Sequence, residues 1–543
     1  MTEQPILRAI SRNEWLAVVA SSVAASVLAT MWSWRHNAML NYGDAIAHMH
    51  IARRVFDSRH PGFSELGSVW LPLPHLLLVP FVAVYTWWAN GIAGMIPSAL
   101  AYIASCAGIY RLARHWLRPP EALLSLLFFA LNPNLLYLQT TAMTEPLFLC
   151  EMIWLAVWLV EWRASLNNDP PRAARLLVGI AIVLIAAVFT RYDGWILAFL
   201  AWTSVGIVQL RRGTLRFRTF WITTAAVVAA PIVWFAFNAV GFGDRLDFAR
   251  GPYSAAAIEL RTATPGSGPP HPGWHDPWVS FLFFMKTAEM DATGEAWGNT
   301  LLSIATLGTA WACLTTRHRA FLWTLLLWLP IPFYAYSIAF ASVPIFLPVW
   351  WPHSWYNTRY GMELLPALAL GLGFAAQFAI AVSREFKPQS TKYTAGVLFA
   401  LLLGNSLVVL RGHPLTYVEG TKNIEARRPF ELQIPPVLRS LLASRPGALV
   451  LMKTSVYPQI VALTGIPLRQ TINETDQKLY TDALAAPAAH AAIFLAFDGD
   501  EVDRAVREHP GGLTQVGRFV APGMPTGTVY VSGTPITTNA TNR

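Results

Sequence analysis

From its first residues to residue 411, the chain alternates long apolar runs with short polar loops. Each long run has about 20 residues, enough for a helix to cross a hydrocarbon core of roughly 30 Å. The pattern predicts eleven crossings, and the expected segments are 14–34, 92–112, 120–138, 146–163, 174–190, 195–210, 219–238, 297–315, 320–340, 361–382 and 393–410. The first run is expected to remain as an anchor rather than to be cleaved as a signal peptide. We therefore expect residues 1–411 to form an α-helical, polytopic membrane domain.

Basic residues gather in alternate loops of this pattern. The loops concerned carry Arg111, Arg114, Arg118, Arg163, Arg172, Arg175, Arg211, Arg212, Arg216, Arg218, Arg317, Arg319, Arg384, Lys387 and Lys392. The positive-inside rule predicts that these loops are cytoplasmic, and Arg8 and Arg12 place the amino terminus on the same side. Residues 71–89 must then lie along the membrane surface, because one more crossing would move the first basic loop outside. Three prolines within 71–89 favour this interpretation.

A second surface helix is expected just before that segment, over residues 45–56. Its apolar side consists of Ala45, Met49, Ala52 and Phe56, and its polar side of His50, Arg53, Arg54 and Asp57. Apolar residues on one stripe of a helix are typical of a helix lying at an interface. The first outside loop therefore contains two expected juxtamembrane helices.

Residues 412–543 have the mixed composition of a globular domain. Strands are predicted over 448–454, 491–499 and 527–532, and helices over 457–465 and 500–510. With eleven crossings this small α/β domain emerges outside the cytoplasm. We find no phosphate loop, nucleophile elbow or metal motif in it, and expect it to dock partners or contact the acceptor.

Composition supports a membrane protein. Hydrophobic residues make up 54% of the chain and charged residues 13%, and the mean hydropathy is +0.40. Soluble domains carry about 25% charged residues. The net charge of +9 comes mainly from loop arginines, so it does not indicate nucleic-acid binding. Cys106, Cys150 and Cys313 all fall in apolar runs and are expected to be small hydrophobic residues, not disulfide partners.

Several short motifs resemble those of the GT-C glycosyltransferases, in particular the protein O-mannosyltransferase and lipid A aminoarabinose transferase group. The motifs are "YGDA" (42–45), "WLPLPH" (70–75), "TAMTEPLFL" (141–149), "TRYDGW" (190–195) and "WYNTRYGMELLP" (355–366). The resemblance covers roughly residues 10–410. It implies a sugar donor linked to a lipid phosphate and an aspartate of the first outside loop as base, which here is Asp44. Ala45 follows Asp44 where the protein mannosyltransferases have an Asp-Glu pair, so the acceptor class stays open.

Sugar transfer from a polyprenyl phosphate sets simple chemical demands. The phosphate leaves as a stable anion, so one carboxylate, expected to be Asp44, suffices to deprotonate the acceptor and give inversion. Arginines suit the phosphate, and Arg191 and Arg359 are the expected contacts. Other interpretations are open: Asp44 as a helix N-cap, Arg191 as a partner of Asp193, and Arg53 and Arg54 as lipid-headgroup contacts.

Further substrate-binding candidates lie in the outside loops and at span ends. They are Glu145, His75, His353, Tyr356, Asn357 and Tyr360. Glu145 before Pro146 also suits a helix start, and the aromatic residues around 350–361 also suit an interface belt. His271, His275 and Asp276 resemble a metal site only loosely, and a solvated loop is the preferred interpretation. No metal and no cofactor is therefore expected.

Together these features predict an integral membrane glycosyltransferase, a hexosyl- or pentosyltransferase, acting in a bacterial inner membrane with its active site outside the cytoplasm. The expected partners are a polyprenyl-phosphate-linked sugar, membrane lipids and an acceptor of protein, glycan or lipid nature. Three alternatives stay open: a transferase of the same fold that uses an oligosaccharide or a lipid diphosphate, a lipid or solute transporter, and a non-catalytic scaffold. A transporter would favour ionisable residues inside spans.

Overall fold

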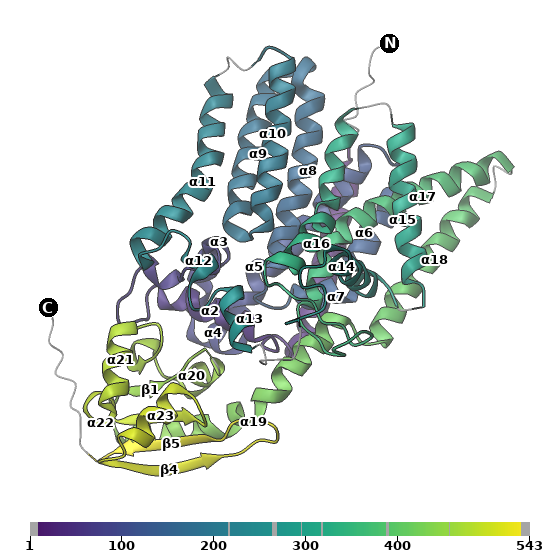
Figure 1. Ribbon diagram of the computed structural model, residues 1–543. Coiled ribbons are helices and arrows are strands. Elements are labelled where there is room, and N and C mark those ends of the chain that lie inside the picture. Colours follow the sequence, from purple (N-terminus) through teal and green to yellow (C-terminus); the bar gives the residue numbers. More distant parts are fainter. Residues whose placement is uncertain are drawn as a thin grey trace. The chain divides into compact units, whose positions relative to one another are not determined.

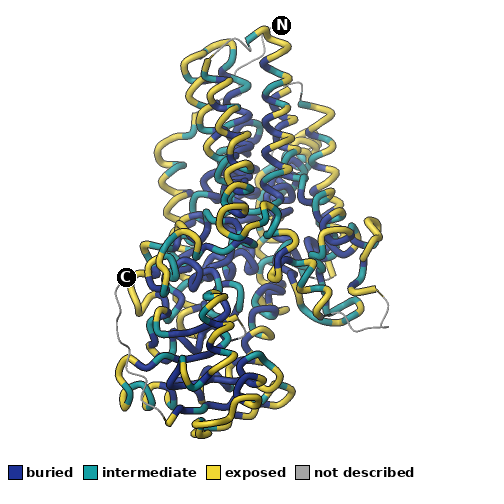
Figure 2. The backbone as a smooth tube through the Cα atoms, turned by 60° about the vertical axis from the view of Figure 1, so that its left-hand side comes forward, coloured by how far each residue is buried: buried dark blue, intermediate teal, exposed yellow. Residues whose placement is uncertain are grey.

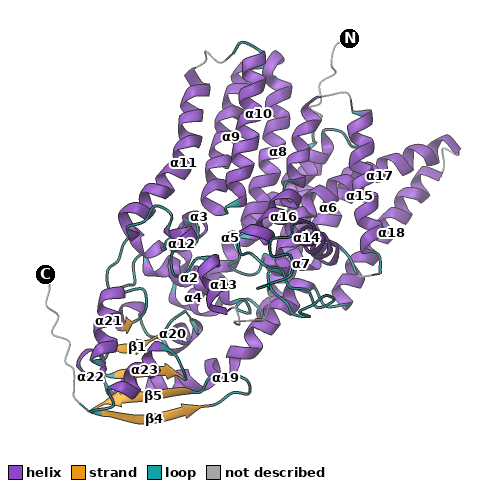
Figure 3. Ribbon diagram, in the orientation of Figure 1, coloured by secondary structure: helices purple, strands orange, loops and turns teal. Residues whose placement is uncertain are grey.

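The computed structural model describes residues 9–214, 218–262, 269–294, 296–316, 319–386, 390–455 and 457–533. Some residues discussed above lie outside these ranges, namely Arg8, Arg216, Arg317 and Lys387. The chain forms two compact units. The helical unit comprises Met1–His36, Ser68–Pro74 and Met95–Glu419, and the sheet unit comprises Asn37–Gly67, His75–Gly94 and Gly420–Arg543. Helices dominate the first unit, and the strands all belong to the second (Figure 3).

Long helices build the helical unit. Its elements are α1 (Arg12–Arg35), α5 (Ile92–Arg114), α6 (Pro119–Ala130), α7 (Pro133–Leu138), α8 (Glu145–Asn168), α9 (Pro170–Thr190), α10 (Asp193–Arg211), α11 (Arg218–Phe242), α12 (Asp247–Arg250), α13 (Ala255–Thr262), α14 (Pro277–Ala292), α15 (Gly298–Thr315), η2 (Arg319–Trp328), α16 (Pro330–Phe340), η3 (Thr358–Leu364), α17 (Leu365–Phe386) and α18 (Ser390–Arg411). Helices α8, α9 and α10 run side by side (Figure 1). Proline near the first position starts several of them, as at Pro133 and Pro170.

Eight helical segments within the described residues are long and apolar enough to cross a membrane. They are Arg12–Arg35, Ile92–Arg114, Pro170–Thr190, Asp193–Arg211, Arg218–Phe242, Arg319–Phe340, Thr358–Phe386 and Thr391–Ser444. Their outward sides are exposed (Figure 2) and apolar: Leu28 is 67% exposed and Val240 89%. Apolar surface of this kind needs lipid around it, so the protein is a multi-pass membrane protein.

Each of the eight segments corresponds to one of the eleven expected crossings. The other three expected crossings lie at 120–138, 146–163 and 297–315. The first is broken at Leu131 and Asn132 into α6 and α7. The second is the 24-residue α8, which contains Glu145, Glu151 and Glu161, and the third is the 18-residue α15. The number of crossings stays a prediction.

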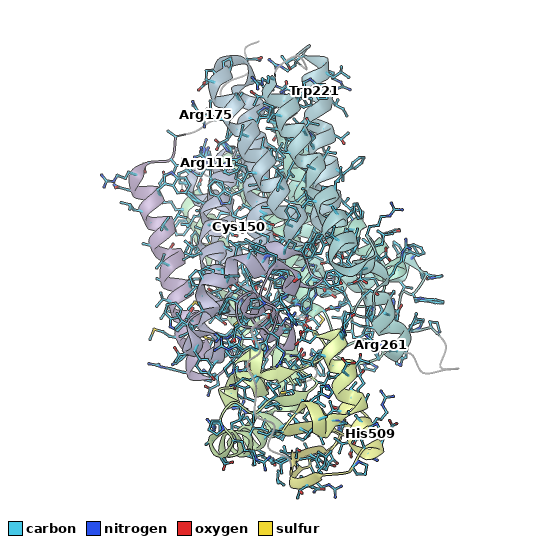
Figure 4. The ribbon with its side chains drawn as sticks, turned by 90° about the vertical axis from the view of Figure 1, so that its left-hand side faces the viewer. Arg111, Cys150, Arg175, Trp221, Arg261 and His509 are labelled. Atoms are coloured by element: carbon cyan, nitrogen blue, oxygen red, sulfur yellow. The ribbon has the colours of Figure 1, made fainter. Side chains whose placement is uncertain are left out.

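Basic loops meet at one end of the helical unit. Glu161, near the end of α8, accepts hydrogen bonds from Arg111 of α5 and from Arg172 of α9, the latter at 2.9 Å. Arg111, Arg175 and Trp221 lie toward the same end, with Cys150 farther from it (Figure 4). Three of the arginine-rich loops therefore share one end, as a common cytoplasmic face would require.

The sheet unit contains a five-stranded sheet with strand order β2-β1-β3-β5-β4. The strands are β1 (Val450–Met452), β2 (Thr471–Ile472), β3 (Ile493–Phe497), β4 (Leu513–Phe519) and β5 (Gly527–Ser532). The first three strands pair in parallel, while β5 pairs antiparallel with β3 and β4. The helices are α19 (Leu415–Ser444, from Gly420 on), α20 (Gln459–Thr464), α21 (Gln477–Ala485), α22 (Pro487–His490) and α23 (Glu501–Glu508). The predicted α/β class of this region is confirmed.

The same unit includes the first loop after α1. This loop forms α2 (Gly43–Arg54), η1 (Phe63–Leu66), most of α3 (Pro72–Val82) and α4 (Tyr85–Asn90). By its contacts, the loop is therefore grouped with residues 420–543, although the predicted domain boundary lay at residues 411 and 412.

The expectation of a two-sided α2 is wrong in part. His50 and Asp57, assigned to the polar side, are buried, whereas Phe56, assigned to the apolar side, is 38% exposed. Buried residues lie around most of the circumference of α2, so helical periodicity alone did not identify its buried side.

Candidate functional site

The helical unit contains a buried group of charges that we call the arginine–carboxylate cluster. Its members are Arg191, Arg359, Glu145, Asp193, Glu363 and Glu419. They come from the start of α8, the turn between α9 and α10, η3, and the start of α19. Glu145 lies about 24 Å along α8 from Glu161, at a rise of 1.5 Å per residue. The cluster is thus at the opposite end of that helix from the basic loops.

Arg191 uses its whole guanidinium within the cluster. Its Nε lies 3.2 Å from Asp193 Oδ2, and Nη2 lies 2.9 Å from Glu363 Oε1. Nη1 donates to the Thr144 hydroxyl at 3.0 Å and to Glu145 at 3.4 Å, and Nη2 also donates to the Tyr334 hydroxyl at 2.8 Å. Arg191 thus donates four hydrogen bonds and forms an ion pair with Glu363, so each of its three guanidinium nitrogens has a partner. The predicted pair with Asp193 is present.

Arg359 shares a carboxylate with Arg191. Its Nε donates to Glu145 Oε1 at 3.0 Å, and its Nη1 donates to Glu419 Oε1 at 2.9 Å. Glu419 also accepts from the backbone N–H of Asn357 at 2.9 Å and from the backbone N–H of Thr358 at 3.0 Å. Glu145 therefore joins the two arginines, and Glu419 fixes the turn that presents Arg359.

Two tyrosines cover the guanidinium groups. Tyr360 lies with its ring centroid 5.1 Å from the guanidinium carbon of Arg191 and 5.1 Å from that of Arg359. Tyr334 stacks on Tyr360 at 5.1 Å and donates its hydroxyl to Glu363 at 2.7 Å. Aromatic faces attract cations at such distances. Of the predicted binding residues, Glu145, Arg191, Arg359, Asn357 and Tyr360 are thus brought together.

The cluster contains more carboxylates than guanidiniums. Four carboxylates surround two arginines, and the nearby Asp291 of α14 is buried with neither carboxylate oxygen hydrogen-bonded to any described residue. Burial raises the pKa of Asp291 well above its usual value, and Glu419 and Glu145 add to the rise. Burial alone would lower the pKa of Arg191. The negative charges of Asp193 and Glu363 raise it by more than that, so the pKa of Arg191 ends well above its usual value. A phosphate reaching these arginines must displace carboxylates, and their phosphate-binding role stays a prediction.

Two further predicted candidates, His353 and Tyr356, lie in the loop just before η3. The His353 ring bonds to the carbonyl of Pro348 at 2.9 Å and is exposed. Tyr356 is 45% exposed, and its backbone pairs with that of Phe346. The bond to Pro348 directs the His353 ring to its own loop, so its substrate role has no support from the cluster geometry. The substrate role of Tyr356 stays a prediction.

The sheet unit holds the other predicted residues, Asp44 and His75. Asp44 lies in the first turn of α2, whose N-cap is Tyr42, so the N-cap interpretation of Asp44 is wrong. One turn along, His48 is buried, and its Nδ1 lies 2.8 Å from Nε2 of the fully buried His75. Residues four apart on a helix share a face. Asp44 is thus followed on its own face by a buried histidine pair.

Arg53 and Arg54 are engaged within the sheet unit. Arg53 pairs with Asp57 at 2.9 Å, donates to the carbonyl of Val82 at 2.7 Å and lies 4.4 Å above the Trp88 ring. Arg54 pairs with Glu65 at 3.3 Å. These contacts oppose the interpretation that both arginines bind lipid headgroups.

The loose metal trio is not assembled. His271 Nε2 lies 3.0 Å from Glu259, the His275 ring stacks on Trp274, and Asp276 caps α14 by accepting from two backbone N–H groups. Among the described residues no group of three or more His, Cys, Asp or Glu is placed to hold a metal ion. The absence of a metal requirement stays an expectation.

Sequence reasoning missed Glu363, Glu419, Tyr334 and Asp291 as members or neighbours of the cluster. Glu363 had a signal: it is an acid within an apolar stretch at a span end, and such residues are costly unless paired. Glu419 and Asp291 lie in ordinary polar sequence, so only the packing reveals them.

These elements define a polytopic membrane protein with a buried charge cluster at one end of its helices and a small sheet domain. No family model and no curated protein matches the chain. Solved structures that match include ArnT from Cupriavidus metallidurans bound to undecaprenyl phosphate and the same protein in the apo state.

The first ArnT structure has a TM-score of 0.57 at 14% sequence identity, and the match covers 95% of this chain and 98% of the ArnT chain. The second has a TM-score of 0.55 at 13% sequence identity, and the match covers 94% of this chain and 98% of the ArnT chain. ArnT is a lipid A aminoarabinose transferase of GT-C fold, so the predicted GT-C fold is confirmed.

Proposed function

We propose that the protein is an integral membrane glycosyltransferase that moves a hexosyl or pentosyl group from a polyprenyl phosphate to an acceptor outside the cytoplasm. The observation that carries this proposal is the likeness in fold to ArnT over nearly the whole length of both chains, together with the undecaprenyl phosphate bound to one of the ArnT structures. A polyprenyl phosphate is therefore the lipid carrier to test first.

The proposed reaction is a single inverting displacement. Asp44 takes the proton of the acceptor hydroxyl, and the acceptor oxygen attacks the anomeric carbon. The bond between that carbon and the phosphate oxygen breaks, and the polyprenyl phosphate leaves with the electron pair. Asp44 lies in the first turn of α2, at the amino-terminal end of that helix.

Arg359 is assigned to the donor phosphate ahead of Arg191. Each guanidinium nitrogen of Arg191 has a partner, so Arg191 is better suited to hold Glu145, Asp193 and Glu363 in place. Arg359 pairs with the carboxylates of Glu145 and Glu419. Charge growing on a departing phosphate would strengthen a guanidinium contact in the transition state.

We further propose that the basic end of the helical unit is cytoplasmic, in a bacterial inner membrane, and that the sheet domain lies outside. The gathering of Arg111, Arg172 and Arg175 at one end supports this orientation through the positive-inside rule.

The test is donor turnover by the purified protein in lipid nanodiscs. The lipid that co-purifies is identified by mass spectrometry, and a matching polyprenyl-phosphate sugar is supplied with cell-envelope acceptor. We expect release of polyprenyl phosphate without any ion gradient. Movement of the lipid between leaflets with no cleavage of the sugar–phosphate bond would instead identify a transporter.

A further inference from the structure

The helix that bears Asp44 begins without the usual local signal. Ser, Thr, Asp and Asn are the side chains that commonly cap a helix, but the N-cap of α2 is Tyr42 and the first helical residue is Gly43. Glycine adds conformational freedom at this point. Local sequence therefore defines the position of the first turn, and of Asp44, only weakly.

A buried arginine from α19 holds the segment that enters this turn. Arg427 Nη2 donates to the backbone carbonyls of Leu40 and Asn41, the latter at 2.9 Å. Arg427 and Asn41 are each 5% exposed. Glu431, one turn farther along α19, lies 3.5 Å from Arg427 Nε. Hydrogen bonds from a charged donor are about twice as strong as neutral ones, so the guanidinium ties two successive carbonyls to α19.

Other contacts attach the loop farther from Asp44. The Tyr85 hydroxyl of α4 donates to the carbonyl of Ala462 of α20, beside which α4 lies (Figure 1). The Gln459 side chain donates to the carbonyl of Ala89 at 2.8 Å, and Asp57 accepts from the backbone N–H of Leu468 at 3.4 Å. These bonds secure α4 and the end of α2, whereas Arg427 acts at the residues just before Asp44.

We propose that residues 420–533 position the proposed base, and that Arg427 is the positioning residue that sets the start of α2. The inference rests on the proposed function, because it assigns Arg427 a role in the use of Asp44. It goes beyond a docking role for the C-terminal domain, because it makes this domain part of the support of the active site.

The first test measures hydrogen exchange in the full-length protein in nanodiscs. Arg427→Gln removes the charged guanidinium, and Arg428→Gln is the matched control, since Arg428 is the exposed neighbour on the same helix. We expect exchange over residues 38–46 to speed up by about tenfold or more in Arg427→Gln and to stay unchanged in the control. Unchanged exchange in Arg427→Gln would overturn the proposal.

The second test measures turnover of a polyprenyl-phosphate sugar. Arg427→Gln should lower kcat by about 10²-fold, the scale expected for a catalytic group misplaced by about 1 Å, with little change in the KM of the donor. In an Asp44→Asn background the same substitution should lower residual turnover less than about twofold, because the two residues act as one unit. A full, additive loss in that background would contradict the proposal and assign Arg427 a general structural role.

Arg427→Lys covers the case in which Arg427→Gln fails to fold. One nitrogen of Arg427, Nη2, binds both carbonyls. Lysine keeps the charge, but its side chain is one bond shorter and lacks the planar guanidinium, so exchange and kcat should lie between those of wild type and the glutamine variant. Wild-type values in Arg427→Lys and a folded, fully active Arg427→Gln would each refute the idea. A wild-type protein without any turnover would refute the proposed function instead, and the exchange test would still decide whether Arg427 holds α2.

Discussion

The arginine–carboxylate cluster and the start of α2 hold their charged groups in opposite ways. In the cluster, Arg191 and Arg359 are surrounded by carboxylates, and each side chain is fixed by several others. At α2, Asp44 is a carboxylate in the first helical turn, and Arg427 of α19 holds the backbone just before that turn. The first arrangement depends on side-chain ion pairs, and the second on the placement of the main chain.

The difference separates two tasks. A dense, buried network of charges is rigid, and removing one member leaves the others uncompensated. A general base must instead lie within reach of the proton that it takes, so its placement matters most. We therefore expect substitutions in the cluster to act mainly on stability, and substitutions around α2 mainly on turnover.

Removing Arg359 should produce the largest loss of stability. Arg359→Ala leaves Glu145 and Glu419 without a shared cation in a buried site, which costs about 3–5 kcal/mol. Arg384, exposed in the last turn of α17, provides the control Arg384→Ala. Thermal unfolding in detergent measures the stability of both variants. Equal midpoints would contradict the structural role of the arginine–carboxylate cluster.

The lysine variant sharpens the same comparison. Arg359→Lys keeps a positive charge, so it should unfold at a temperature between those of wild type and Arg359→Ala, while donor affinity falls because the two-pronged geometry is lost. Binding of a polyprenyl-phosphate sugar by Arg359→Lys with wild-type affinity would mean that the phosphate lies elsewhere.

His50 should make the sheet unit sensitive to acid. Burial, followed by the charges of Arg54 and Arg53, lowers the pKa of His50 from 6.5 to about 3. The unfolded chain therefore binds a proton below pH 6.5 that the folded chain takes up only near pH 3. Stability is highest above pH 6.5 and should fall by about 2 kcal/mol between pH 6.5 and 5 from this group.

The variant His50→Phe tests this pH dependence. Phenylalanine keeps an aromatic ring beside Trp88, which His50 contacts at a centroid distance of 5.0 Å, but it does not titrate. The loss of stability between pH 6.5 and 5 should be smaller in His50→Phe than in wild type. An unchanged pH profile would show that His50 is not the responsible group.

Residues 71–89 are predicted to lie along the membrane surface without crossing it. The accessibility of the first outside loop tests this prediction. Ser64 and Thr86 are both exposed and lie on either side of α3. In a background without Cys106, Cys150 and Cys313, cysteines at both positions should react with an impermeant thiol reagent from the same, outer side. Reaction of the two positions from opposite sides would contradict the eleven-crossing topology.

Metal removal should have the smallest effect. The reaction as proposed uses a carboxylate and cationic side chains, so chelators should leave turnover unchanged. Loss of turnover on chelation, restored by a divalent ion, would contradict this expectation.

Regular patterns in the sequence predicted much of the fold. The apolar runs located all eight apolar helical segments. β1 and β3 fell within the predicted strands because their residues are continuous apolar runs, and β5 because it has β-branched and aromatic residues at its centre. Two strands were missed: β2 has two residues, and β4 is an edge strand with mostly exposed side chains. Neither gives a periodic signal long enough to read.

The candidate site was less predictable because its partners are distant in the chain. The pair Arg191–Asp193 is visible within three residues of sequence, but Glu419 reaches Arg359 from 60 residues away, and Arg427 reaches Asn41 from 386 residues away. No local pattern encodes a side chain that binds a backbone carbonyl of another segment. The prediction of the buried side of α2 failed for the same reason, because packing and not periodicity decides which side is buried.

The most direct test of the account is turnover by Asp44→Asn. Asparagine is close to aspartate in shape but cannot accept the acceptor proton, so transfer from a polyprenyl-phosphate sugar should fall by about 10²–10⁴-fold. Folding and donor binding should stay near wild type, as measured by thermal unfolding and by lipid binding in nanodiscs. Turnover above about a tenth of the wild-type rate would contradict the general-base role of Asp44 and with it the proposed mechanism.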